Sequence, residues 1–465
     1  MKKLVLAAGL MVLTGSAFSK STLPNIVVLL CDDLGYGDLE CYGHPHIKTP
    51  HLNQLAAEGM RFTDFYSTAA VCSPSRVGLM TGRSPNRAGV YDWIPGGKNI
   101  HMRASEITIP QLLKQAGYAT CMSGKWHCNG KFNSDAQPQP DDAGFDHWFG
   151  TQNNASPSHE NPRNFVRNGT RVGPLEGFSC QLVVDEALSW LKGQQKQNPD
   201  QPFFMYLAFH EPHEPVASPM ELVNQYREVA RSEDEAQYFA NVANMDAAVG
   251  RLMATLKAMN VDQNTLVVFT SDNGPETLLR YERANRSFGR AAPLRGMKLW
   301  TTEAGFRVAG IMRWPAELPA GRVSAQTVSA LDFLPTFCDL AGTKPPADLQ
   351  LDGANFMPVF DNHPVVREKP LIWVYYHATN ERRVAMRDGD WKVLAKLNIE
   401  KCRGIDSQNE GQVKGATLSD FQMFNVREDL GEEKDLSQSH PEKLEELKQR
   451  LEVHYQELVQ DSHVW

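Results

Sequence analysis

Four short apolar runs, each followed directly by charged or polar side chains, constrain the fold of this 465-residue chain more than any other feature. The runs occupy residues 25–30, 118–122, 203–209 and 265–270. Segments with helical spacing lie between them, at about 50–59, 108–116, 181–192 and 233–259. This alternation predicts an α/β fold, in which helices flank a large mixed, mostly parallel sheet.

The residues that follow these four runs carry chemically useful side chains. In open α/β sheets, ligands bind outside the carboxyl ends of the strands. One such end would be unremarkable because loops are polar, but four ends that supply carboxylates, imidazoles and a lysine indicate one assembled site. The residues are Asp32 and Asp33 after the first run, Lys125 and His127 after the second, His210 and His213 after the third, and Asp272 and Asn273 after the fourth.

The acidic and amide members of this set offer only oxygen ligands. Such a set favours Ca²⁺, with Mg²⁺ as the alternative, over zinc, which prefers His or Cys. A zinc site around His127 is disfavoured because six residues separate Cys121 from Cys128. The predicted metal ligands are Asp32, Asp33, Asp272 and Asn273.

The stretch CSPSRVGLMTGR, residues 72–83, reads as the start of a helix. Pro74 suits the first helical position, so we expect Ser73 to cap the helix and Cys72 to project near its N-terminus. There the helix dipole and Arg76 favour an anion. Cys72 would then be half of a disulfide, a thiolate nucleophile or the precursor of another group. A soft thiolate is a poor match for a hard cation, whereas an oxygen nucleophile would suit that metal.

The N-terminus has the pattern of an export signal. Lys2 and Lys3 precede an apolar run that is too short to span a bilayer, and small residues follow it. We therefore expect a signal peptide over residues 1–19 and a periplasmic or secreted protein without membrane insertion. The eight cysteines show no spacing typical of a small disulfide framework.

The pattern changes towards the C-terminus. Apolar stretches at 371–377, 382–388 and 391–397 alternate with turns, and 441–459 has one apolar helical face. We predict a catalytic domain over 20–358 and a smaller C-terminal α+β subdomain, an antiparallel sheet plus helix, over 359–465. The Asn-, Pro-, Ser- and Gly-rich segment 133–176 is expected to form loops.

The formal net charge of −8 argues against nucleic-acid binding, so an anionic substrate requires a local cluster of positive charge. The arginines of segment 274–296 fit either contacts with an anionic substrate or solvated loop charge. Tryptophans in the predicted loops fit either stacking on a sugar or core packing. These residues are Arg280, Arg283, Arg286, Arg290 and Arg295, and Trp93, Trp148 and Trp300.

The pattern C-x-P-S-R followed by T-G-R at Cys72–Arg83 resembles the signature of type I sulfatases, in the alkaline-phosphatase-like superfamily. The stretch GYATCMSGKWH at 117–127 resembles the second signature of that family. Further similarities are LLCDD at 29–33, SDNG at 271–274 and LRGMK at 294–298. The resemblance extends from about residue 24 to the C-terminal helix.

The resemblance implies a role for each matching residue. A maturation enzyme would oxidise Cys72 to formylglycine (3-oxoalanine), whose hydrate would bind Ca²⁺ beside the four predicted ligands. Arg76 and Lys125 would hold this hydrate, and His127 would take a proton from it when sulfate is released. His213 and Lys298 would contact the sulfate and protonate the leaving group. Two further substrate contacts are expected, at His210, which either lines a sugar subsite or supports His213, and at Arg295.

The expected function is therefore hydrolysis of a sulfate ester on a carbohydrate, with carrageenan or another sulfated galactan as the hypothesis. Aryl sulfates and glycosaminoglycans are alternative substrates. A phosphomonoester or phosphonate-ester hydrolase of the same superfamily is an alternative enzyme. A non-catalytic binding homologue would have lost some of the residues above, and none of them is missing.

Overall fold

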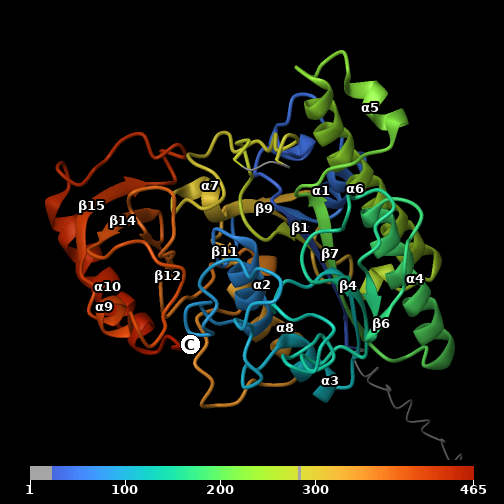
Figure 1. Ribbon diagram of the computed structural model, residues 1–465, viewed down its shortest axis with the longest axis horizontal. Coiled ribbons are helices and arrows are strands. Elements are labelled where there is room, and N and C mark those ends of the chain that lie inside the picture. Colours follow the sequence, from blue (N-terminus) through green and yellow to red (C-terminus); the bar gives the residue numbers. More distant parts are fainter. Residues whose placement is uncertain (1–22, 281–283) are drawn as a thin grey trace, which may run out of the picture.

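The computed structural model describes residues 23–280 and 284–465, and its larger part is built on an eleven-stranded sheet (Figure 1). Its spatial order is β10-β2-β9-β8-β1-β7-β3-β4-β5-β6, with β11 beside β2. The five strands β8-β1-β7-β3-β4 run parallel, while β9, β5 and β6 pair antiparallel with their neighbours. The strands are β1 (Asn25–Asp32), β2 (Met60–Tyr66), β3 (Ala119–Lys125), β4 (His147–Thr151), β5 (Val166–Arg167), β6 (Thr170–Arg171), β7 (Phe203–Pro212), β8 (Thr265–Ser271), β9 (Arg307–Arg313), β10 (Arg322–Ser324) and β11 (Val328–Ser329).

Helices cover both faces of this sheet, which confirms the predicted class. Side chains alternate between the faces of a strand. Ile26 and Val28 of β1 accordingly join one apolar core with α2, α3 and α8, while Val27 and Leu29 join another with α1, α4 and α6. The helices are α1 (Pro50–Ala57), α2 (Cys72–Thr81), α3 (Ile109–Gln115), α4 (Ser179–Gln197), α5 (Met220–Tyr226), α6 (Glu233–Ala258), α7 (Glu303–Phe306) and α8 (Phe333–Leu340), with 3₁₀ turns η1 (Glu40–Tyr42), η2 (Asp262–Asn264), η3 (Ala330–Asp332) and η4 (Met357–Asp361).

The four predicted central strands are present, and each begins within one residue of its apolar run. They extend further than predicted, however. Strand β1 continues to Asp32, which pairs with Pro212 of β7, because polar side chains do not prevent the backbone from continuing its ladder. The prediction of loops over 133–176 is wrong in part, since β4, β5 and β6 lie there.

The predicted C-terminal antiparallel sheet is also present, and it lies beside the main sheet (left in Figure 1). Its strands, in spatial order, are β12 (Leu371–Val374), β13 (Val384–Asp388), β14 (Trp391–Leu397) and β15 (Leu418–Asn425). Helix α10 (Pro441–Gln460) packs on it through the predicted apolar face, with Leu447, Leu451 and Tyr455 buried, and α9 (Glu410–Lys414) lies nearby. The domain boundary between residues 358 and 359 stays a prediction.

The described residues contain no helix that is long and apolar enough to cross a membrane. The predicted signal peptide, residues 1–19, lies outside the described residues. All eight cysteines are free thiols in the structure.

A buried ion cluster joins the two sheets. The Nζ atom of Lys392, on β14, lies 3.0 Å from Glu303 Oε1 of α7 and 2.9 Å from Glu432 Oε1. Glu303 also accepts a hydrogen bond of 2.6 Å from the hydroxyl of Tyr66 on β2. Arg307 Nη1 also lies 3.0 Å from Glu303 Oε2. Burial raises the pKa of Glu432, and Lys392 acts against that rise as the cation beside this buried carboxylate.

We expect Lys392→Met to lower the free energy of unfolding by about 3–5 kcal/mol, because it leaves the buried carboxylate of Glu432 without its lysine counter-charge. Urea unfolding followed by tryptophan fluorescence measures this change. The matched control is Lys443→Met, which removes an exposed lysine 2.8 Å from Glu446 and should cost less than about 1 kcal/mol. Equal unfolding midpoints for the two variants would contradict the role given to Lys392.

Candidate active site

The predicted site residues meet at the carboxyl edge of the parallel strands. Asp32 ends β1, Lys125 ends β3, and Asp272 directly follows β8. Strand β1 lies next to β8 and one strand away from β3, so side chains about 240 residues apart in sequence come into contact. The main-chain N–H of Asp33 donates to Asp272 Oδ1 at 3.2 Å.

Two buried cations pair with the carboxylates of Asp32 and Asp272, and Arg76 lies beside both. Lys125 Nζ donates to Asp32 Oδ2 at 2.5 Å. Arg76 Nε donates to Asp272 Oδ2 at 2.9 Å, and its Nη1 donates to the carbonyl oxygen of Lys125 at 2.8 Å. Helix α2, which carries Arg76, is thereby tied to both β3 and β8.

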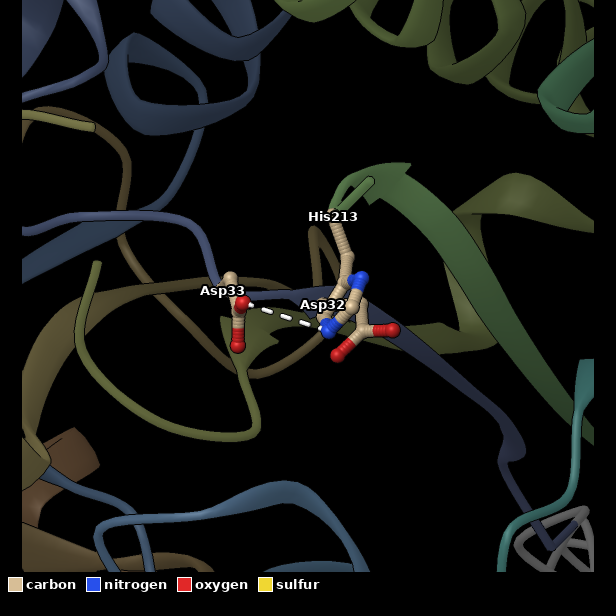
Figure 2. Close-up of side chains that lie close together, drawn as sticks. All are labelled: Asp32, Asp33 and His213. Carbon is tan, nitrogen blue, oxygen red and sulfur yellow. Dashed lines mark ion pairs between the residues drawn. The ribbon is translucent and has the colours of Figure 1, made fainter. Parts of the chain in front are cut away.

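The neighbouring carboxylate, Asp33, has its own set of donors. It accepts hydrogen bonds from Lys298 Nζ at 2.7 Å and from Asn273 Nδ2 at 2.8 Å. His213 Nε2 lies 3.5 Å from Asp33 Oδ2, and Figure 2 shows its imidazole beside both Asp32 and Asp33. The backbone of Asp33 has a φ of 65°, in the left-handed region that non-glycine residues rarely occupy. Such strain is typical of functional sites.

The pKa values of the two carboxylates that share Arg76 are shifted in opposite directions. Burial raises the pKa of Asp32, but Lys125, His213 and Arg76 together outweigh burial and hold that pKa well below its usual value. Burial, with the nearby charge of Asp32, raises the pKa of Asp272 to about 7. A further positive charge beside Asp272 would favour its ionised form.

Two orphaned oxygens show that this site fits a divalent cation. Asp32 Oδ1 and Asn273 Oδ1 are buried and have no hydrogen-bond partner among the described residues. Single ligand atoms of Asp32, Asp33 and His213 all lie within 4.8 Å of one another. Hard oxygen donors next to unsatisfied acceptors suit Ca²⁺ or Mg²⁺. The residues that would hold the ion are the predicted ones: Asp32, Asp33, Asp272 and Asn273.

Helix α2 begins earlier than predicted. Its first residue is Cys72 and its N-cap is Val71, so the predictions of a Ser73 cap and of Pro74 at the first position are wrong. The hydroxyl of Ser73 instead accepts a hydrogen bond from the main-chain N–H of Ile94 at 3.0 Å. A long-range hydrogen bond has replaced the local one that the sequence suggested.

Cys72 itself lies at the helix start, 3% exposed. Burial raises the pKa of its thiol to about 11, although Lys125 and Lys298 act in the opposite direction. The protein therefore does not stabilise a thiolate at this position, which argues against Cys72 as a plain cysteine nucleophile.

His127 is held by its Nε2 atom, which lies 3.1 Å from the carbonyl oxygen of Ile94. A carbonyl oxygen only accepts, so Nε2 carries the ring hydrogen and Nδ1 keeps its lone pair. Nδ1 is buried without a hydrogen-bond partner among the described residues. Burial, with Lys125 and Arg76, holds the pKa of His127 well below its usual value, which keeps the ring neutral and able to accept a proton.

A pocket of about 370 Å³ opens over Cys72. Four predicted catalytic residues line it, namely Cys72, His127, His213 and Lys298. Burial, with the charge of Lys298, lowers the pKa of His213 to about 4. Trp93, which is 39% exposed, and Arg280 also line the pocket. The sequence left open whether these two residues contact substrate or have a structural role, and the structure places both at the site.

Two other candidates, His210 and Arg295, are not among the described residues that line this pocket. His210 is buried and its Nε2 lies 2.8 Å from Thr151 Oγ1. The guanidinium of Arg295 contacts the carbonyl oxygen of Glu432 and lies over the ring of Phe424, 5.4 Å from its centroid. The substrate contacts of His210 and Arg295 stay predictions.

None of the remaining predicted arginines and tryptophans is among the described residues that line the pocket. Arg286 Nε donates to Asp234 at 2.9 Å, and Trp148 is buried against Phe132. Arg290 and Trp300 are not among the described residues that line the pocket, and Arg283 lies outside the described residues.

Two pocket residues were missed at the sequence level. Asn153 and Asn154 line the pocket, and the Oδ1 atom of each is buried without a hydrogen-bond partner among the described residues. They come shortly after β4, as Asp32 and Asp33 come shortly after the apolar run of β1. The signal that could have identified them was therefore the same, a polar pair after an apolar strand, but β4 lay in a segment read as loop.

Comparisons with known proteins place these features in a family. The family described as Sulfatase matches residues 24–343, and the one described as N-sulphoglucosamine sulphohydrolase, C-terminal, matches residues 297–458. The chain is similar to N-acetylgalactosamine-6-sulfatase of Rattus norvegicus, with 33% identity over 94% of this chain and 86% of the relative. The match to the same enzyme of Canis lupus familiaris, at 36% identity, spans 72% of this chain and 65% of the relative.

Solved structures with the same architecture include the crystal structure of Ps i-CgsB. Its TM-score is 0.79, with 29% identity over 95% of this chain and 93% of that one. The same protein has been solved in complex with k-i-k-neocarrahexaose.

We expect Ca²⁺ to stabilise this protein through Asp32. Calcium at about 100 times its dissociation constant should add about 2.7 kcal/mol to the stability, seen as a higher melting temperature after removal and readdition of the ion. Asp32→Asn should abolish most of that increase. Asp185→Asn, which changes an exposed carboxylate paired with Arg251, should leave the increase intact. An unchanged increase in Asp32→Asn would contradict this metal site.

Proposed function

The chain belongs to the sulfatase family and is a sulfuric ester hydrolase, and from that premise we propose that it removes sulfate from a sulfated carbohydrate, with a galactan such as carrageenan as the substrate. The observation that carries this proposal is the single pocket that joins Cys72, His127, His213 and Lys298. One neutral imidazole with a free lone pair and one ammonium group there provide both a proton acceptor and a positive charge.

Sulfuryl transfer mainly requires in-line positioning and positive charge around the sulfate oxygens. When present, Ca²⁺ and a formylglycine made from Cys72 supply an activated oxygen nucleophile. Arg76 and Lys125 orient the carboxylates that hold the ion. Lys298 and His213 contact the sulfate oxygens, and the ammonium group of Lys298 provides the proton for the departing alcohol. Nδ1 of His127 accepts the proton that must leave the enzyme's oxygen when sulfate is released.

The substrate class is supported by the relatives and by the rim of the pocket. N-acetylgalactosamine-6-sulfatase is named for a galactose-type sugar, and carrageenan is a galactan. The side chain of Trp93 is an exposed apolar surface at the pocket, of the kind on which sugar rings stack. Asn153 and Asn154 provide amide groups that suit sugar hydroxyls. A galactose-type sugar sulfate fits all three features.

Glycosaminoglycans containing N-acetylgalactosamine are the second candidate substrate, because the curated relatives named above act on that sugar by name. Aryl sulfates come third, since the chain is also 31% identical to arylsulfatase A of Bos taurus. The phosphonate monoester hydrolase of Agrobacterium radiobacter, at 18% identity, shares the fold alone. We further propose export by the N-terminal segment to the periplasm or the medium, where sulfated polysaccharides are found.

The matured protein should carry an aldehyde at residue 72. Mass spectrometry of the peptide around Cys72, from protein made together with a formylglycine-generating enzyme, should show formylglycine in proportion to the activity. Cys72→Ser, which keeps an oxygen but cannot be matured in this way, should fold and be almost inert. An unmodified thiol in fully active enzyme would refute this proposal.

The substrate class is tested by sulfate release from carrageenan, ulvan, chondroitin and heparan fragments and from an aryl sulfate. We expect release from galactose-type sugars. Trp93→Ala should raise KM for the preferred oligosaccharide by about 3- to 10-fold, because stacking is lost, and should leave the small aryl ester nearly unaffected. Sulfate release from aryl esters only would exclude the carbohydrate assignment.

A further inference from the structure

The hydroxyl of Ser73 is linked to His127 by way of one residue, Ile94. Ser73 Oγ accepts the main-chain N–H of Ile94 at 3.0 Å, and the carbonyl oxygen of Ile94 lies 3.1 Å from His127 Nε2. All three residues are buried, Ser73 and Ile94 completely. The residue next to the nucleophile position therefore fixes the residue that orients the histidine.

A second tether reaches the same carbonyl oxygen from the other side. Gln152 Nε2 donates to Ile94 O at 3.1 Å and to the carbonyl oxygen of Asn129 at 2.8 Å. The main-chain carbonyl of Gln152 in turn accepts the N–H of His127 at 2.8 Å. Gln152 therefore holds the backbone of His127 directly and its ring indirectly, through the carbonyl oxygen of Ile94.

The hydrogen bonds from Ile94 to Ser73 and from Gln152 to Ile94 are needed because His127 has an unfavourable backbone conformation. Its φ is 53°, in the left-handed region. A non-glycine residue keeps such a conformation only where its surroundings determine it. A neutral imidazole also has two tautomers, and only the one with its hydrogen on Nε2 leaves a lone pair on Nδ1. The surroundings must therefore fix both the ring position and the ring hydrogen.

We propose that Ser73 is a positioning residue for the reaction: through Ile94 it holds His127 in the Nε2–H tautomer, so that Nδ1 accepts a proton at the nucleophile. The inference rests on the proposed function of His127 as the base. It gives the second residue of C-x-P-S-R a role in the folded enzyme, separate from any role in the oxidation of Cys72. Replacing the hydroxyl frees the N–H of Ile94 and lets its carbonyl move away from the ring.

Activity provides the first test, with the rate expressed per molecule of formylglycine measured by mass spectrometry. Ser73→Ala should lower kcat by about 10- to 100-fold, the cost of a misplaced catalytic group, with KM changed by less than about threefold. Ser73→Thr keeps the hydroxyl and should restore most of kcat. The matched control is Ser123→Ala, since Ser123 is equally buried and donates to the carbonyl oxygen of Val183. That control should stay within about twofold of the wild type.

The ring hydrogen provides the second test and needs neither substrate nor maturation. Nitrogen-15 NMR of histidine-labelled protein, with the His127 signals assigned by their loss in His127→Gln, reports which ring nitrogen carries hydrogen. We expect Nε2–H in the wild type and mixed tautomers in Ser73→Ala. A hydrogen on Nδ1 in the wild type, or a normalised kcat of Ser73→Ala equal to that of Ser123→Ala, would overturn the inference. Full activity of His127→Gln would instead overturn the proposed function.

Discussion

The buried charges at the carboxyl ends of the central strands must compensate one another for these strands to pack together. Three buried carboxylates meet three buried cations there, and burying any of these charges alone would cost several kcal/mol. They come from β1, β3, α2 and the segments after β8, so the site forms only when the central strands are assembled. A bound divalent cation would leave this balanced cluster positive, which explains how a chain with a net charge of −8 can attract an anionic ester. The charges are Asp32, Asp33 and Asp272, and Arg76, Lys125 and Lys298.

The C-terminal subdomain supports the pocket without contributing a predicted catalytic side chain. Asp92 accepts hydrogen bonds from the hydroxyl of Tyr375 at 2.9 Å and from Arg403 at 2.7 Å, both beyond the main sheet. The next residue is Trp93 at the pocket rim, and Ile94 follows with its contact to His127. Residues that follow β12 and β14 therefore anchor the segment that carries both Trp93 at the pocket rim and Ile94 beside His127.

The sequence was sufficient to predict features whose signal is local or repeated. Apolar runs predicted the central strands, and the polar residues after them predicted a site at one edge. Features decided by distant contacts were not predictable: Ser73 resembles a helix cap but bonds to Ile94, and β4 is short and lies in a loop-like segment. Missing β4 also meant missing Asn153, which follows it. Residue roles came from the family resemblance, since composition cannot distinguish a catalytic lysine from a surface one.

We propose that the strand ends form an oxygen-only cation site beside an oxygen nucleophile at residue 72. Crystallography of the matured protein tests it most directly, with anomalous diffraction recorded to identify the ion. We predict one calcium ion in contact with Asp32, Asp33, Asp272 and Asn273, and density at residue 72 for an oxygen-bearing side chain without sulfur. A zinc signal, or an intact cysteine sulfur and no cation in crystals of fully active enzyme, would contradict the account.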